Sequence, residues 1–267
     1  EVLITGFEAR IGDAVLKASA QACASLGMDV HVTSHFRGGY DWLTLWGVGD
    51  IARNAARHKQ IEDGGHAALW DIGYVNAPGR GKEPGVSYIR LSIDENHPWR
   101  MFDVTPADAS RWDALRMPLR DDYDPSGPVI VIGMGPKSRE HLGLHQWEID
   151  ALNGAKARFP ERRVLYRPKP RRVMDTHINW PLSDGGDIAD ALRGASLVIC
   201  RHSNVASDAC IAAIPVECED GAAFWLYRHG SNPTPEARID FLRRMAWWQW
   251  RTDEQREAWT FLQMVCA

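Results

Sequence analysis

Basic and small polar residues that could bind a phosphate group come directly after apolar segments in the second half of the chain. They are Arg167 and Lys169 in VLYRPKP, and His202, Ser203 and Asn204 in ICRHSN. Each apolar segment is typical of a buried strand, and open α/β sheets bind ligands at the carboxyl ends of their strands. Backbone N–H groups at the start of a following helix also attract anions. These five residues are therefore candidates for binding the phosphate of a nucleotide.

Two loops rich in small residues extend this candidate phosphate site. The loop GMGPKSR follows a third apolar segment, and its glycines allow a ligand to approach the backbone closely. Lys137 and Ser138 in that loop could donate hydrogen bonds to phosphate, although an exposed basic loop is the ordinary alternative. The segment EDGAA places Gly221 and Ala222 where a phosphate or a sugar could also reach the backbone.

Candidate groups for proton transfer lie in the first half of the chain. Asp71 ends the apolar segment AALWD and precedes a glycine turn, so its carboxylate could take a proton from an acceptor hydroxyl. An aspartate in such a place also commonly caps a turn. Asp94 and His97 in SIDENHPW are alternatives for the base or for acceptor binding. Glu8, after the first apolar segment, and Trp46 are further candidates on the acceptor side.

Other chemistry has little support in the sequence. The chain contains no HExxH motif, no histidine cluster with ligand spacing and no GxSxG motif. We therefore expect no metal, no Ser-His-Asp hydrolase site and no cofactor beyond a co-substrate. The five cysteines include no CxxC pair, which favours reduced, buried thiols in a cytoplasmic protein. A net charge of −4 gives no general nucleic-acid signature, and no apolar run reaches the roughly 18 residues of a membrane span.

Alternating apolar strands and amphipathic helices must position these groups. We predict strands at 2–6, 29–34, 42–46, 66–71, 86–93, 129–133, 163–167, 197–200 and 215–218. We predict helices at 13–26, 54–63, 146–159, 187–193 and 205–213, and two more between residues 235 and 265. Strands that alternate with helices predict parallel βαβ units. The turn-rich segment 121–128 is typical of a linker, which gives two Rossmann-like α/β domains over residues 1–125 and 126–267.

The second half resembles the nucleotide-sugar-binding domain of GT-B glycosyltransferases. The stretch HSNVASDACIAAIPVECEDGAA is similar to the part of such enzymes that holds the donor phosphates. RPKP is similar to a basic motif of capsule-type and polysialyl-type transferases. WDIGY, GPKSR and FLRRMAWWQW also resemble compact glycosyltransferases encoded by bacteriophages. The resemblance implies a GT-B fold, in which two Rossmann-like domains face a cleft and a helical tail returns to the first domain.

This resemblance also implies an activity. The enzyme would be a metal-independent hexosyl- or pentosyltransferase that uses a nucleotide sugar, expected to be a UDP-sugar, and Asp71 would be the base of an inverting reaction. The favoured acceptor is 5-hydroxymethylcytosine in double-stranded phage DNA, in the host cytoplasm and away from membranes. The alternatives are a surface-polysaccharide or capsule-type transferase, and a nucleotide-sugar-binding protein without turnover.

Overall fold

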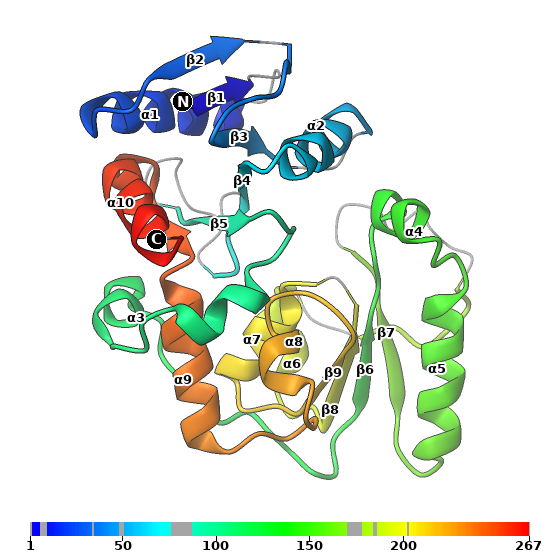
Figure 1. Ribbon diagram of the computed structural model, residues 1–267. Helices are drawn as coiled ribbons and strands as arrows, with labels where there is room; N and C mark the ends of the chain where they lie inside the picture. The colour runs from blue at the N-terminus through cyan, green and yellow to red at the C-terminus, as the bar shows by residue number, and fades with distance from the viewer. Residues whose placement is uncertain are drawn as a thin grey trace. The chain divides into compact units, whose positions relative to one another are not determined.

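The computed structural model describes residues 2–5, 10–33, 35–47, 51–75, 87–169, 178–183, 186–201 and 203–266 (Figure 1). Side chains are described throughout these ranges except at 3–5, 10, 11, 137 and 141. The chain divides into two compact units. Residues 1–106 and 244–267 form the first unit, and residues 107–243 form the second. The second unit is therefore one continuous segment, whereas the first is built from two.

The first unit contains a mixed six-stranded sheet in the order β10-β5-β4-β3-β1-β2. Its strands are β1 (Val2–Thr5), β2 (Val30–Thr33), β3 (Trp42–Trp46), β4 (His66–Ile72), β5 (Ile89–Ile93) and β10 (Gln249–Trp250). Strands β1 to β4 are parallel to their neighbours, while β5 is antiparallel to both β4 and β10. The apolar residues of β3 and β4 are buried on both faces of the sheet. This pattern is typical of parallel strands, because helices cover both faces of such a sheet.

Helices on both faces of this sheet bury its alternating side chains. The helices of the first unit are α1 (Arg10–Ser25), α2 (Ile51–Glu62) and α10 (Gln255–Val265), with the short 3-10 helices η1 (Trp99–Val104) and η2 (Thr252–Glu254). Leu43 and Leu45 of β3 pack with Ala56 of α2 on one face. Trp42 and Trp46 point to the other face, because side chains alternate along a strand.

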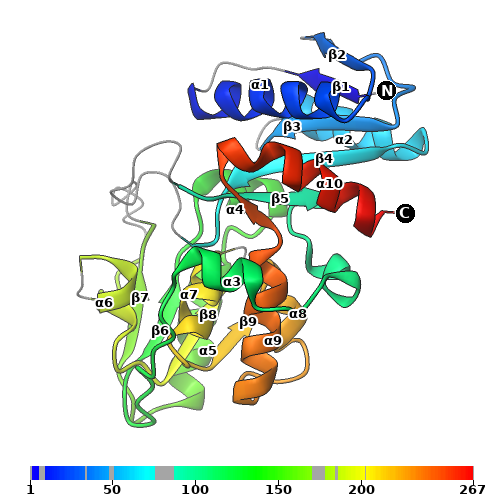
Figure 2. The same ribbon diagram turned by 90° about the vertical axis from the view of Figure 1, so that its left-hand side faces the viewer.

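The second unit contains a four-stranded, fully parallel sheet in the order β7-β6-β8-β9. The strands are β6 (Val129–Ile132), β7 (Val164–Arg167), β8 (Leu197–Cys200) and β9 (Val216–Cys218). The helices are α3 (Ser110–Leu115), α4 (Pro136–Leu142), α5 (Trp147–Arg158), α6 (Ile188–Leu192), α7 (Val205–Ile211), α8 (Phe224–Tyr227) and α9 (Pro235–Ala246), of which α9 runs into the first unit (Figures 1 and 2). Leu152 and Ala155 of α5 join Val129, Val131 and Leu197 in a core cluster on one face.

The predicted α/β class with parallel sheets is confirmed, and two details of the prediction differ. Residues 249–250 were expected in a helix but form β10, which pairs with Ile89 and Arg90 of β5. The expected linker at 121–128 is part of the second unit, because its backbone is tied to that unit's helices. Arg120 and Asp122 donate their N–H groups to the carbonyls of Ile211 and Ala212. The boundary between the units thus lies at residue 106, and residues 244–267 join the first unit.

Among the helices of the described residues, none is long and apolar enough to cross a membrane. The last helix, α10, instead packs along α1 inside the first unit. Trp259 on α10 is fully buried and meets Trp42 edge to face, with ring centroids 5.6 Å apart. Ser19 of α1 donates a buried 2.5 Å hydrogen bond to Gln255 of α10. The carboxyl-terminal helix is therefore part of the core of the first unit.

We expect Trp259→Ala to lower the free energy of unfolding by about 3–5 kcal/mol, because it removes a large, fully buried ring from the contact between α10 and β3. Urea unfolding followed by circular dichroism measures the change. Met264 lies on the same helix but is 55% exposed, so Met264→Ala is the matched control and should change stability by less than about 0.5 kcal/mol. Equal effects of the two substitutions would contradict the packing described for α10.

Candidate functional site

The candidate phosphate-binding loops all lie at one edge of the sheet in the second unit. The four strands are parallel, so the loops that follow them leave from the same edge. The chain passes from β6 to β7 on one side and then to β8 on the other side of β6. In open α/β sheets, ligands bind at such a reversal of strand order, outside the carboxyl ends of the strands. The loops after β6 and β8 flank this point.

The loop after β6 is held by a buried carboxylate. Glu148 on α5 is only 2% exposed and accepts a 2.7 Å hydrogen bond from the backbone N–H of Met134. Its other oxygen, Oε2, lies 3.0 Å from Nε of Arg139, whereas the hydroxyl of Tyr166 donates at 3.3 Å to Oε1, the oxygen that accepts from Met134. A Cβ at position 133 would lie 2.5 Å from that hydroxyl, so only glycine fits there. The backbone at Met134 and the side chain of Arg139 thus both contact one buried carboxylate.

Glu148 was not among the residues expected to shape the site. Its signal in the sequence is weak, because an acidic residue in the first turn of a helix ordinarily interacts with the helix dipole at the surface. The relevant contacts join Glu148 to residues 134, 139 and 166, which are 14, 9 and 18 positions away. Such contacts follow from the packing of α5 on the sheet and not from local spacing.

Lys169 and Ser138 come together around Gly135. Lys169 is exposed, and its Nζ lies 3.5 Å from the position that a Cβ of residue 135 would take. Ser138 is in the first turn of α4, where its N–H is bonded to the carbonyl of Gly135 at 3.0 Å. The side chain of Lys137 lies outside the described part of the chain. One cation and one hydroxyl-bearing residue thus lie beside the glycine loop.

Arg167 lies at the expected strand end, but its guanidinium is bonded to the protein backbone. The side chain is buried, and its Nη2 donates to the carbonyl of Asp187 at 3.1 Å and to that of Gly186 at 3.4 Å. Burial lowers the pKa of Arg167, and the nearby carboxylate of Asp187 partly opposes this shift. Arg167 therefore ties β7 to the segment that precedes α6, a contact that was not predicted.

The loops after β8 and β9 also meet. A Cβ at Gly221 would lie 4.0 Å from the carbonyl oxygen of Ser203, and Gly221 has a φ of +90°, which favours glycine. Ala222 beside it is buried. The hydroxyl of Ser203 accepts a 3.2 Å hydrogen bond from the N–H of Val205, and Asn204 precedes the first residue of α7. His202 lies outside the described residues.

Arg201 is neutralised by carboxylates of the neighbouring loop. Its guanidinium is ion-paired with Glu219 and lies 3.5 Å from Asp220. Two carboxylates around one guanidinium reduce its attraction for a further anion. Among the described basic residues that follow β7 and β8, the exposed Lys169 is therefore the best placed to contact a phosphate.

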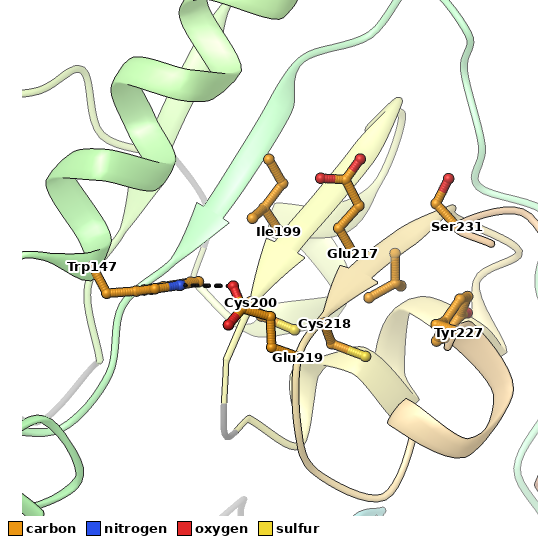
Figure 3. Close-up of a pocket in the computed structure, with 9 residues that line it drawn as sticks. Trp147, Ile199, Cys200, Glu217, Cys218, Glu219, Tyr227 and Ser231 are labelled. Atoms are coloured by element: carbon orange, nitrogen blue, oxygen red, sulfur yellow. Dashed lines mark hydrogen bonds between the residues drawn. The ribbon is translucent and has the colours of Figure 1, made fainter. Parts of the chain in front are cut away.

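A pocket of about 230 Å³ lies beside the loop after β9 (Figure 3). It is lined by Trp147, Ile199, Cys200, Val216, Glu217, Cys218, Glu219, Tyr227 and Ser231. The indole N–H of Trp147 donates to Glu219 at 3.3 Å across the pocket, as Figure 3 shows. Burial raises the pKa of Cys218 to about 12, with Asp220 and Glu219 adding to the shift. This thiol is therefore protonated at neutral pH and unsuited to act as a nucleophile.

In the first unit, Asp71 and His97 lie in one connected group. Asp71 is the sixth residue of β4, and one oxygen of its carboxylate accepts a 2.8 Å bond from Arg90 of β5. Arg90 also lies 3.3 Å from Nδ1 of His97, and the hydroxyl of Tyr74 lies 3.0 Å from the same atom. The Asp71 side chain is 39% exposed, so its carboxylate is accessible to a substrate. Arg90 and Tyr74 were not predicted to take part.

The other acceptor-side candidates lie apart from this group. Asp94 follows β5 and accepts bonds from the N–H of Ala67 at 2.7 Å and from the ring of His66 at 2.9 Å. His66 and Ala67 begin β4, whereas Asp71 lies near the carboxyl end of that strand. Asp94 therefore lies at the opposite end of β4 from Asp71. Trp46 ends β3, half-buried, and Gly12 of α1 leaves room for its ring. Glu8 lies outside the described residues.

Among the described residues, no group of three or more His, Cys, Asp or Glu side chains has a geometry suited to a metal ion. The five cysteines are free thiols.

Comparisons with known proteins give a structural likeness and no sequence family. No family model matches the chain, and no curated protein matches it. The solved structure of the β-Kdo 2,4-transferase KpsC of Thermosulfurimonas dismutans superposes with a TM-score of 0.54 at 10% identity, covering 91% of this chain and 89% of that one. The β-Kdo 2,7-transferase KpsC of the same organism gives 0.55 at 12% identity, covering 98% and 99%. The chain therefore has a fold similar to that of these two transferases over nearly its whole length.

We expect Glu148→Ala to lower the free energy of unfolding by about 3–5 kcal/mol, because it removes the buried carboxylate that accepts from the N–H of Met134 and lies against the guanidinium of Arg139. Asp150 lies on the same helix and is exposed, so Asp150→Ala should cost less than about 1 kcal/mol. Urea unfolding of the two variants and the unmodified protein measures both changes. A small loss for Glu148→Ala would show that the carboxylate does not hold the loop.

Proposed function

We propose that the protein transfers a sugar from a nucleotide-activated donor to an acceptor hydroxyl. The observation that carries the proposal is the edge of the sheet in the second unit. There the glycine loop after β6, Lys169 and Ser138 lie beside the reversal of strand order, and the loop at Ser203 and Gly221 follows the neighbouring strand. The likeness in fold to two Kdo transferases supports the same reaction class.

The chemistry follows from the charge that the reaction releases. When the bond between the sugar and the donor phosphate breaks, negative charge develops on the departing nucleotide. A fixed ammonium and hydroxyl groups stabilise that charge, and they contribute most when they are held in place beforehand. Lys169 and Ser138 supply these groups without a metal ion in the proposed mechanism. Glu148 keeps the loop around them from moving.

Asp71 is the proposed base on the acceptor side. Its carboxylate is ion-paired yet partly exposed, so an acceptor hydroxyl can reach it and give up its proton during an inverting transfer. A retaining transfer needs no base of this kind. The anomeric configuration of the product relative to the donor therefore decides whether Asp71 has this role.

For the acceptor we propose a hydroxyl of a saccharide. The two similar structures are transferases of Kdo, a sugar, which agrees with the capsule-type alternative drawn from RPKP. The DNA acceptor, 5-hydroxymethylcytosine, gains no comparable support, and the chain carries a net charge of −4. Binding to the DNA backbone depends mainly on positive charge. Hydroxymethylated DNA is therefore one arm of the test and not the leading proposal.

The reaction class is tested by incubating the purified protein with a panel of nucleotide sugars, including UDP- and CMP-linked donors. Each donor is combined with an oligosaccharide, with DNA containing 5-hydroxymethylcytosine, or with unmodified DNA as the control. Mass spectrometry then detects the added sugar. Transfer to the oligosaccharide supports the proposal, and transfer to the modified base supports the DNA acceptor instead. Binding of a donor without transfer or hydrolysis would show a binding protein.

We expect Lys169→Ala to raise the Kd for the nucleotide donor about tenfold or more, because a hydrogen bond to a charged group contributes about 1.5–3 kcal/mol. Isothermal titration calorimetry with the donor identified in the panel measures the change. Lys156 in the same unit is bonded to the carbonyl of Pro160, so Lys156→Ala is the matched control and should leave the Kd unchanged. An unchanged Kd for Lys169→Ala would place the donor elsewhere.

A further inference from the structure

We infer that Arg90 is a positioning residue that holds the carboxylate of Asp71 for the transfer reaction. The inference rests on the proposed function, in which Asp71 accepts the proton of the acceptor hydroxyl. Arg90 itself is 8% exposed, so it acts on the reaction through Asp71 and not by meeting the substrate.

The first step of the argument is the geometry of the ion pair. Asp71 and Arg90 are directly opposite each other on the antiparallel strands β4 and β5. The Nη2 of Arg90 lies 2.8 Å from one oxygen of Asp71, and the other oxygen accepts a 2.7 Å bond from the N–H of Ile72. Both carboxylate oxygens therefore have a fixed donor, and the plane of the carboxylate is determined by two strands of the sheet.

The second step is the anchoring of Arg90 from its other side. Its Nη1 lies 3.3 Å from Nδ1 of His97, and its central carbon lies 5.5 Å from the centre of the Tyr74 ring. The hydroxyl of Tyr74 lies 3.0 Å from the same nitrogen of His97. Tyr74 and His97 are both buried, so the guanidinium is held among fixed groups.

The third step is the difference in exposure within the pair. The side chain of Arg90 is 10% exposed and that of Asp71 is 39% exposed. The cation is thus enclosed, while the carboxylate reaches the surface with one oxygen already oriented. A reacting group held in one geometry contributes to the rate because less freedom is lost when the substrate binds. Replacing Arg90 removes the donor that orients Asp71, and the carboxylate can then turn away from a bound hydroxyl.

The test is a double-mutant cycle of the unmodified protein, Asp71→Asn, Arg90→Gln and the double variant, with kcat and KM measured for sugar transfer. We expect Arg90→Gln to lower kcat at least tenfold while KM for the nucleotide donor changes less than about twofold. Arg90→Lys keeps the charge without the fork of donors, so it should recover part of the loss. In the Asp71→Asn background, Arg90→Gln should change kcat by less than about twofold, since the carboxylate that accepts the proton is already gone.

A matched control comes from the same unit. Arg251 pairs with Asp253 at the surface, so Arg251→Gln removes an ion pair of the same type and should leave kcat unchanged. If Arg90→Gln lowers kcat by the same factor in both backgrounds, Arg90 acts independently of Asp71 and the inference is overturned. An unchanged kcat for Arg90→Gln overturns it as well.

Unfolding the same four proteins in urea tests the contact between Arg90 and Asp71 independently of any sugar transfer. It therefore distinguishes a failure of this inference from a failure of the proposed function. If the unmodified protein transfers no sugar to any acceptor, the proposed function fails. The inference is then decided by whether the unfolding effects of Asp71→Asn and Arg90→Gln are additive. Non-additive effects support an arginine that holds the carboxylate, and additive effects overturn it.

Discussion

Strands that pair in parallel run in the same direction, and this shared direction brings their carboxyl ends to one edge of the sheet. In the second unit it gathers the ends of four strands, with Lys169, Ser203 and Gly221 in the loops that follow. In the first unit it directs β1, β3 and β4 to one edge, near which Asp71 is found. Strand direction in this way brings together residues that are far apart in the sequence. These residues need not contact one another, so no spacing in the sequence reveals that they are neighbours.

Two ion pairs with enclosed charges then hold the groups that the sheets bring to these edges. Glu148 is enclosed with Arg139 behind the glycine loop, and Arg90 is enclosed behind Asp71. A buried ion pair adds little net stability, because desolvating the charges offsets most of their attraction. Its effect is geometric, because each pair has few alternative arrangements. The glycine loop and the carboxylate of Asp71 are therefore each held in one conformation. Arg139 and Glu148 lie behind the glycine loop, whereas Arg90 alone is enclosed behind the exposed Asp71, and neither pair was apparent from residue spacing.

The strands and most helices were predictable from the sequence because their apolar residues are local and periodic. Leu197–Cys200 and Trp42–Trp46 have the predicted bounds, and α5 differs from its prediction by one residue at each end. The strand at 249–250 was missed because two tryptophans and a glutamine fit a helix as well as a strand, and only pairing with Arg90 distinguishes them. The sequence also placed Asp71 and Lys169 at or just after strand ends, where the structure has them, and their roles stay predictions. It could not give Glu148, Arg90 or the bonds of Arg167 to the segment before α6, since these depend on which elements pack together.

The division of the chain has a consequence for its synthesis. Residues 107–243 leave the ribosome as one continuous segment, so the second unit can complete its sheet while the rest of the chain is still being made. The first unit must wait, because β10 and α10 come from residues after 243. Until they emerge, β5 pairs with β4 alone, and Trp42 lacks the ring of Trp259. The sheet of the first unit therefore keeps an unpaired edge at β5 until the residues of β10 have been synthesised.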